Sequence, residues 1–243
     1  MRQNHLVNVD VWIDYVCPYS FLHTCTIEEV RHVYGSNLHV RWHPLEIRPE
    51  PAVQPMPDVA EVQRVWDEVL YPLAFERGVE ISMPKRIARS HLAFETAHWA
   101  TEHAIFECVH RSIFEGYFRR GEDIEDIEVL ANIAQACDGH GADLRRALDV
   151  RAYRDTVARH IGFGRRIGAS GVPFTLLSRP AATSELARAP VALRGVAPLS
   201  HFHMAVATLF PEGFDANEHE ATIARSSSHP RRDFKLIHEV NAR

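Results

Sequence analysis

The chain has 243 residues, of which 46% are hydrophobic and 24% charged, a balance that allows one substantial buried core. Its formal net charge is −5 with histidine neutral, and no basic tract carries interleaved aromatic residues, which argues against a nucleic-acid partner. No run approaches the roughly 18 apolar residues that a membrane span needs. The first residues lack the apolar segment of a signal peptide, so we expect a cytoplasmic protein.

The first predicted strand delivers a cysteine to the start of a helix. Apolar residues alternate along one face of this strand, namely Val7, Val9, Val11 and Ile13. Pro18 suits the first helical turn, where its missing N–H is not needed, so Cys17 lies at the helix N-terminus. Unpaired amides and the helix dipole favour an anion there, and we expect them to lower the pKa of Cys17.

Ser20 follows on the same helix, where its hydroxyl can turn toward the sulfur of Cys17. The second cysteine of a C-x-x-C motif would occupy this position, but a serine cannot form a disulfide. Cys25, Cys108 and Cys137 form no C-x-x-C pair, and we expect all three to be reduced residues that serve packing.

The middle of the chain, residues 58–160, has the periodicity of helices alone. We predict a helix that Asp58 caps and Pro72 kinks, a second from Ser90, a third over about 105–121, a fourth capped by Asp126, and a shorter and a longer one over 143–168. The Pro-rich segment 48–57 precedes them and is predicted to be an extended linker along the rim of the site.

The motif Gly171-Val172-Pro173 introduces an apolar run that is predicted to be a strand near 173–178. A proline in this position is where a cis X-Pro bond would be a deliberate feature. A further strand near 190–196, a helix over 198–209 and a polar tail complete the prediction.

These motifs together resemble the DsbA-like branch of the thioredoxin superfamily. The resemblance rests on Cys17-Pro18-Tyr19-Ser20, on Val172-Pro173 and on the segment 40–49, and it spans residues 6 to about 210. The families most similar are the FrnE-like oxidoreductases, the 2-hydroxychromene-2-carboxylate isomerases and the kappa-class glutathione transferases. The resemblance implies an α/β fold in which a thioredoxin-like sheet carries a large all-helical insertion. It also implies a thioredoxin-like domain of residues 1–57 and 161–215, an insertion of 58–160 and a tail of 216–243.

The resemblance assigns roles to six residues. Cys17 and Ser20 would be catalytic, and Pro18, Tyr19, Val172 and Pro173 would bind the substrate. The leading hypothesis is that Cys17 attacks a disulfide and that glutathione, or another external thiol, resolves the mixed disulfide. The alternatives are a glutathione-dependent isomerase or transferase acting on a small conjugated molecule, and a non-catalytic binding protein with the same fold.

The chain departs from each related family at the site. FrnE-type oxidoreductases usually carry Cys-Pro-x-Cys, and the isomerases and kappa transferases typically carry Ser-Pro-Tyr-Ser, so Cys17-Pro18-Tyr19-Ser20 is a hybrid. The loop Leu193–Ser200 also lacks the acidic residue that glutathione sites of these families tend to include. We expect no covalently bound cofactor. We also expect no metal, because His201 and His203 fall on different faces of a helix. The expected partners are a disulfide or a small-molecule substrate, glutathione as cosubstrate and a second copy of the chain.

Overall fold

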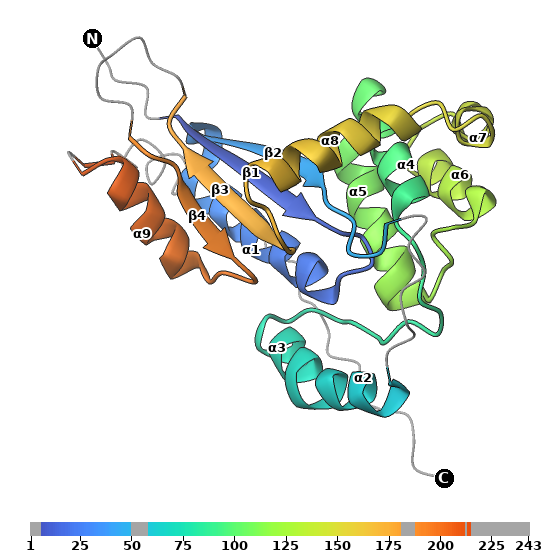
Figure 1. The fold of residues 1–243 in the computed structure, drawn as a ribbon, viewed down its shortest axis with the longest axis horizontal. Coiled ribbons are helices and arrows are strands. Elements are labelled where there is room, and N and C mark those ends of the chain that lie inside the picture. Colours follow the sequence, from blue (N-terminus) through green and yellow to red (C-terminus); the bar gives the residue numbers. More distant parts are fainter. Residues whose placement is uncertain (1–5, 50–57, 181–187, 212, 215–243) are drawn as a thin grey trace, which may run out of the picture.

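The computed structural model describes residues 6–49, 58–180, 188–211 and 213–214. The described residues contain a four-stranded mixed sheet of order β2–β1–β3–β4 (Figure 1). The strands are β1 (Val7–Ile13), β2 (Leu38–Pro44), β3 (Phe174–Ser178) and β4 (Val191–Arg194). β1 runs parallel to β2 and antiparallel to β3, which in turn pairs antiparallel with β4. Residues 50–57, which are most of the predicted linker 48–57, and the predicted tail of 216–243 lie outside the described residues.

Both faces of the sheet are covered, which explains why β1 is buried along nearly its whole length. On one face lie α1 (Pro18–Tyr34) and α9 (Leu199–Leu209), where His23 of α1 contacts Thr175 of β3 and the ring of Phe202. On the other face lies α8 (Arg154–Arg166) (Figure 1). It packs on the indole ring of Trp12. This confirms the predicted α/β class, a thioredoxin-like sheet with a helical insertion.

The inserted helices lie beyond the β2 edge of the sheet and below it (Figure 1). They are α2 (Val59–Val65), α3 (Tyr71–Glu76), α4 (His91–Glu102), α5 (Phe106–Glu115), α6 (Ile127–Ala136) and α7 (Gly141–Asp149). Asp58 and Asp126 cap α2 and α6 through their side chains, as their positions predict. Residue 160, the expected end of the insertion, lies inside α8.

The helix that contains Pro72 continues through it, with a π-helical turn just before the proline. A π-helical turn, η2 (Trp66–Leu70), joins α2 to α3, and the N–H of Tyr71 bonds to the carbonyl of Trp66. Because Pro72 has no N–H to donate, a wider turn just before it lets the chain continue as a helix. A second π-helical turn, η3 (Gly116–Arg120), extends α5 to Gly121, whose φ of +67° ends it.

The expectation that Cys108 and Cys137 are reduced is wrong in this structure. The two residues form a disulfide with a Cα–Cα distance of 5.7 Å, which ties α5 to the end of α6. Their separation of 29 residues gives no local signal, because the packing of two helices brings them together. Cys17 and Cys25 are the free thiols of the described residues.

Candidate functional site

Cys17 occupies the junction between β1 and α1, as its motif predicts. It is the N-cap of α1, with extended backbone angles, and Pro18 is the first helical residue. Its carbonyl accepts the N–H groups of Ser20 and Phe21, which closes the first turn of the helix. The residue is buried, with 5% of its surface exposed.

The loop before β3 reaches the same point from the far end of the chain. The Val172–Pro173 peptide bond is cis, and the thiol of Cys17 donates to the carbonyl of Val172 over 3.8 Å. Pro173 is buried, and its carbonyl accepts the N–H of Gly195. The fold therefore brings Cys17 and Val172 together over 155 residues of sequence.

Ser20 connects the sulfur to the end of β1. The hydroxyl oxygen of Ser20 accepts the N–H of Asp14 over 3.2 Å, and the hydroxyl also hydrogen-bonds Cys17. Since its oxygen is already an acceptor, the hydroxyl proton is available to the sulfur. This geometry gives Ser20 the position that its spacing predicts.

The expected lowering of the Cys17 pKa is wrong. Burial raises the pKa of the Cys17 thiol above its ordinary value, and the nearby charge of Asp14 raises it further. The N–H and hydroxyl of Ser20 and the N–H of Tyr19 act in the opposite direction without overcoming desolvation. The helix start is therefore present, but the loss of water around the sulfur has the larger effect.

Asp14 is a buried acid beside the sulfur that the sequence reasoning did not identify. Its carboxylate accepts the N–H of Ile47 over 2.7 Å and that of Val16 over 3.2 Å, and it hydrogen-bonds Ser90. Complete burial raises the pKa of Asp14 to about 6 despite these donors. An acidic residue at the end of a buried strand, three residues before Cys17, was the signal that could have identified it.

A second buried carboxylate continues this polar network into the insertion. Glu46 contacts Nδ1 of His91 over 2.5 Å, at the start of α4. On the next turn, the buried Glu95 pairs with Arg151 over 2.6 Å and lies 3.7 Å from Nε2 of His91. The negative charge of Glu46 raises the pKa of Asp14 further, so the network and the site are electrostatically coupled.

Two cavities flank the cysteine, and Ile47 lines both. The first, of about 510 Å³, is lined by Val16 and Pro18 on either side of Cys17. The second, of about 600 Å³, is lined by Glu46 and by residues 168–171 of the loop before the cis-proline. Cavity space is therefore present near the cysteine, both toward the insertion and toward the loop before the cis-proline.

The other predicted residues have clear positions. Tyr19 is partly exposed. Its partial burial raises its pKa, and the charge of Cys17 raises the pKa further, so the two side chains are close enough to interact. His23 is fully buried against Thr175 and does not turn back to the thiol. His203 bonds to the hydroxyl of Tyr34. In the described ranges, no group of three or more His, Cys, Asp or Glu side chains could hold a metal ion.

The sheet, the helix-start cysteine and the cis-proline loop define a protein of the thioredoxin class. A family model described as the DSBA-like thioredoxin domain matches residues 8–199. The chain therefore belongs to the DSBA-like thioredoxin domain family.

Several known proteins are similar to this chain over most of their own length. The uncharacterized protein YwbO of Bacillus subtilis (strain 168) is 33% identical over 153 residues, which are 61% of this chain and 75% of YwbO. A probable DsbA oxidoreductase from Streptomyces coelicolor has a TM-score of 0.68 at 21% identity and covers 86% of this chain and 92% of its own. The cytosolic disulfide reductase DsbM from Pseudomonas aeruginosa has a TM-score of 0.58 at 16% identity, over 90% of this chain and 98% of its own, and has also been solved with GSH. At these identities, the two solved structures show the fold alone. For the described part of the chain, no helix is both long and apolar enough to cross a membrane.

Proposed function

We propose that the protein is a thiol-disulfide exchange enzyme that uses Cys17 as its single nucleophile and glutathione as the resolving thiol. The observation that carries this proposal is the position of the Cys17 sulfur, at the start of α1, against the carbonyl of Val172 and between two cavities. Ser20 stands where a resolving cysteine would be. Cys25, the other free thiol, lies eight residues further along α1, roughly 12 Å away along the helix axis.

The reaction takes place in two exchanges. The Cys17 thiolate attacks one sulfur of a substrate disulfide, so a new S–S bond forms while the old one breaks and one substrate thiolate leaves. A glutathione thiolate then attacks the substrate sulfur of the mixed disulfide, and the Cys17 thiolate is released. The net change converts one sulfur of the substrate disulfide to a free thiol and leaves the other sulfur in a mixed disulfide with glutathione.

The raised pKa of Cys17 sets the favoured direction. A strong oxidant of this fold stabilises its reduced thiolate, which makes that thiolate a good leaving group. Burial and the charge of Asp14 destabilise the Cys17 thiolate instead. Cys17 is therefore suited to donating reducing equivalents rather than to acting as a strong oxidant.

The cavity between Leu45 and Gly171 supports the choice of glutathione. Its lining combines the loop before the cis-proline with Arg165 and Glu46, so it offers backbone groups, one cation and one carboxylate, which match the carboxylates and the ammonium group of glutathione. An extended tripeptide with two carboxylates fits this chemistry. That DsbM has been solved with GSH adds support from a protein of the same fold.

The test is the glutathione-dependent reduction of a small disulfide under steady-state conditions. We expect activity in the native protein and a loss of at least about a hundredfold on Cys17→Ser, because the serine cannot form the mixed disulfide. Cys25→Ser, on the same helix, is the matched control and should retain activity. Equal turnover in native protein and Cys17→Ser would exclude Cys17 as the nucleophile.

The protonated state of Cys17 favours a second candidate, glutathione-dependent isomerisation. A thiol that stays protonated can donate a hydrogen bond to the sulfur of bound glutathione, whose own thiolate would then add to a conjugated substrate. This reaction needs a tight binary complex with reduced glutathione, whereas simple exchange does not. Calorimetric titration with reduced glutathione separates the two candidates, since tight binding by Cys17→Ser and native protein alike would favour isomerisation.

A further inference from the structure

The cavity of about 510 Å³ beside Cys17 has features that thiol exchange alone does not require. Val16 and Pro18 form the wall next to the cysteine. Most of the other walls come from the insertion, namely from the α2–η2 helix, from residues 83–87 and from the η3 turn. A molecule bound to the Cys17 sulfur can therefore extend directly between the sheet and the insertion.

The lining of this cavity is mainly apolar. Trp66 and Phe118 are buried at its base. Around it lie three large hydrophobic residues that stay exposed, Ile47 (38%), Val59 (74%) and Ile87 (37%). Single exposed apolar residues are ordinary, but three around one cavity form an apolar surface that suits an apolar group.

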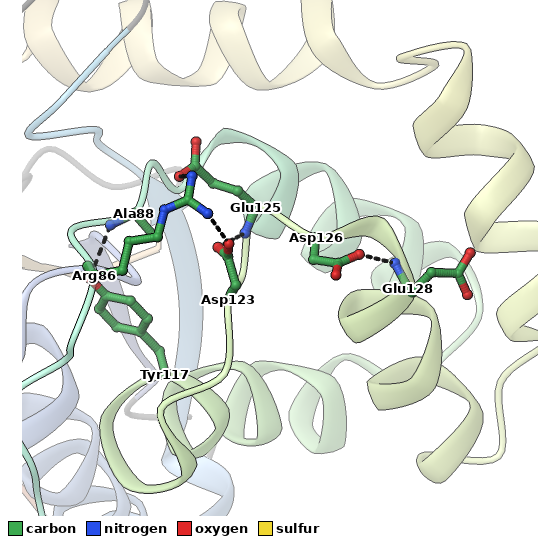
Figure 2. A network of polar contacts seen from close by, with 7 residues as sticks. All are labelled: Arg86, Ala88, Tyr117, Asp123, Glu125, Asp126 and Glu128. Atoms are coloured by element: carbon green, nitrogen blue, oxygen red, sulfur yellow. Dashed lines mark hydrogen bonds and ion pairs between the residues drawn. The ribbon is translucent and has the colours of Figure 1, made fainter.

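Positive charge lies at the same cavity, and none of its lining residues is acidic. The charge of Arg86 is already neutralised, because its guanidinium pairs with Asp123 and Glu125 (Figure 2). Its backbone carbonyl also accepts a hydrogen bond from the hydroxyl of Tyr117. Arg48 and Lys85 also line the cavity, and neither has a carboxylate partner in the described part of the chain. Two cations that have no carboxylate partner among the described residues thus lie beside an apolar wall.

We propose that this cavity selects disulfides in which a compact apolar body, aromatic or aliphatic, carries a carboxylate. The apolar body would contact Trp66, Phe118 and Ile87, and the carboxylate would pair with Arg48 and Lys85. The proposal rests on the exchange reaction at Cys17 and names its substrate class. In the reaction, the Cys17 thiolate forms a bond to one sulfur of such a disulfide. The substrate S–S bond breaks, and the other half leaves as a thiolate.

The experiment compares two small aromatic disulfides that release coloured thiols. Dithiobis(nitrobenzoate) carries a carboxylate on each ring, and dithiodipyridine is neutral. Rates of reaction with Cys17 are measured at low salt, after subtraction of the rate in Cys17→Ser, for the native protein and for the double variant Arg48→Gln with Lys85→Gln. Arg64→Gln is the matched control, because Arg64 lies on α2, pairs with Glu68 and does not line the cavity.

We expect the double variant to lose about fivefold to tenfold in rate with the carboxylate reagent and to keep its rate with the neutral one. Arg64→Gln should change neither rate, and added salt should lower only the rate with the carboxylate reagent. An unchanged ratio of the two rates in the double variant would overturn the assignment of the cavity while leaving exchange at Cys17 intact. If neither reagent modifies Cys17 in any variant, the exchange function itself fails, and the substrate class fails with it.

Discussion

At the scale of single residues, the environment of one sulfur decides the chemistry of the site. Cys17 receives hydrogen bonds from the first turn of α1, yet it is buried next to Asp14, and burial prevails. A protonated thiol at rest is poorly nucleophilic but costs little to bury. The pKa of Cys17 should therefore respond to the charge of Asp14.

Asp14→Asn should move the pH profile of Cys17 alkylation to lower pH. The carboxyl of Asp14, with a pKa of about 6, is mostly ionised at neutral pH, and its charge opposes the Cys17 thiolate. Alkylation by iodoacetamide, corrected with Cys17→Ser, measures this directly. The native midpoint should lie above about 8.5. Asp10→Asn is the control, because Asp10 pairs with Arg41 and His43 instead. An unshifted midpoint in Asp14→Asn would show that the charge does not reach the sulfur.

Two buried histidines should make the protein sensitive to acid. Burial lowers the pKa of His23 and of His110 to about 3, so both stay neutral in the fold while the unfolded chain protonates them near pH 6.5. The free energy of unfolding therefore falls as pH decreases below about 6.5. Asp14 acts in the opposite sense, because its raised pKa makes the folded state take up a proton between about 6 and 3.8.

Urea unfolding at pH 7.5 and 5.5 measures the balance of these groups. We expect lower stability at pH 5.5, and His110→Gln should reduce the difference in the free energy of unfolding between pH 7.5 and pH 5.5 by about 1.4 kcal/mol. Exposed His39 offers the control substitution His39→Gln. Equal pH dependence in native protein and His110→Gln would contradict the buried neutral state.

At the scale of elements, the contact of α8 with β1 holds the insertion against the sheet. A Cβ atom on Gly164 would lie 2.5 Å from the indole nitrogen of Trp12, which is fully buried and stacked on His43. Gly164→Ala should therefore lower the free energy of unfolding by about 1–2 kcal/mol, since overpacking exceeds the gain in helix propensity.

The control for this prediction lies one half-turn earlier on the same helix. At Gly162 the nearest atom to a new Cβ is the flexible end of Arg166, 3.5 Å away. Gly162→Ala should be neutral or stabilising by about 0.5–1 kcal/mol. If thermal or urea unfolding gave the two variants the same stability, the close packing of α8 on Trp12 would be refuted.

At the scale of the whole molecule, the disulfide Cys108–Cys137 closes a loop within the insertion. Thiol titration in denaturant without reductant should count two free thiols, those of Cys17 and Cys25, and four after reduction. Replacing Cys108 and Cys137 by serine should cost about 3 kcal/mol of stability, because a loop of this size restricts the unfolded chain. Four thiols before reduction would contradict the disulfide.

The sequence predicts those parts of the fold that local patterns determine. The alternation of Val7 to Ile13, the prolines at positions 18 and 173 and the caps at Asp58 and Asp126 define strands, helix starts and the loop that faces Cys17. Features that depend on burial or on distant packing could not be predicted in this way. The raised pKa of Cys17 and the buried Asp14 depend on the burial that the folded chain gives them, and the Cys108–Cys137 pairing depends on the packing of α5 against α6.

The central claim is that the Cys17 sulfur exchanges with disulfides, and intact mass measurement after incubation with oxidised glutathione tests it most directly. We predict a gain of one glutathionyl group per chain, mapped by peptide digestion to Cys17, reversed by reductant and absent in Cys17→Ser. A chain that gains no glutathionyl group, or gains it only on Cys25, would contradict the account.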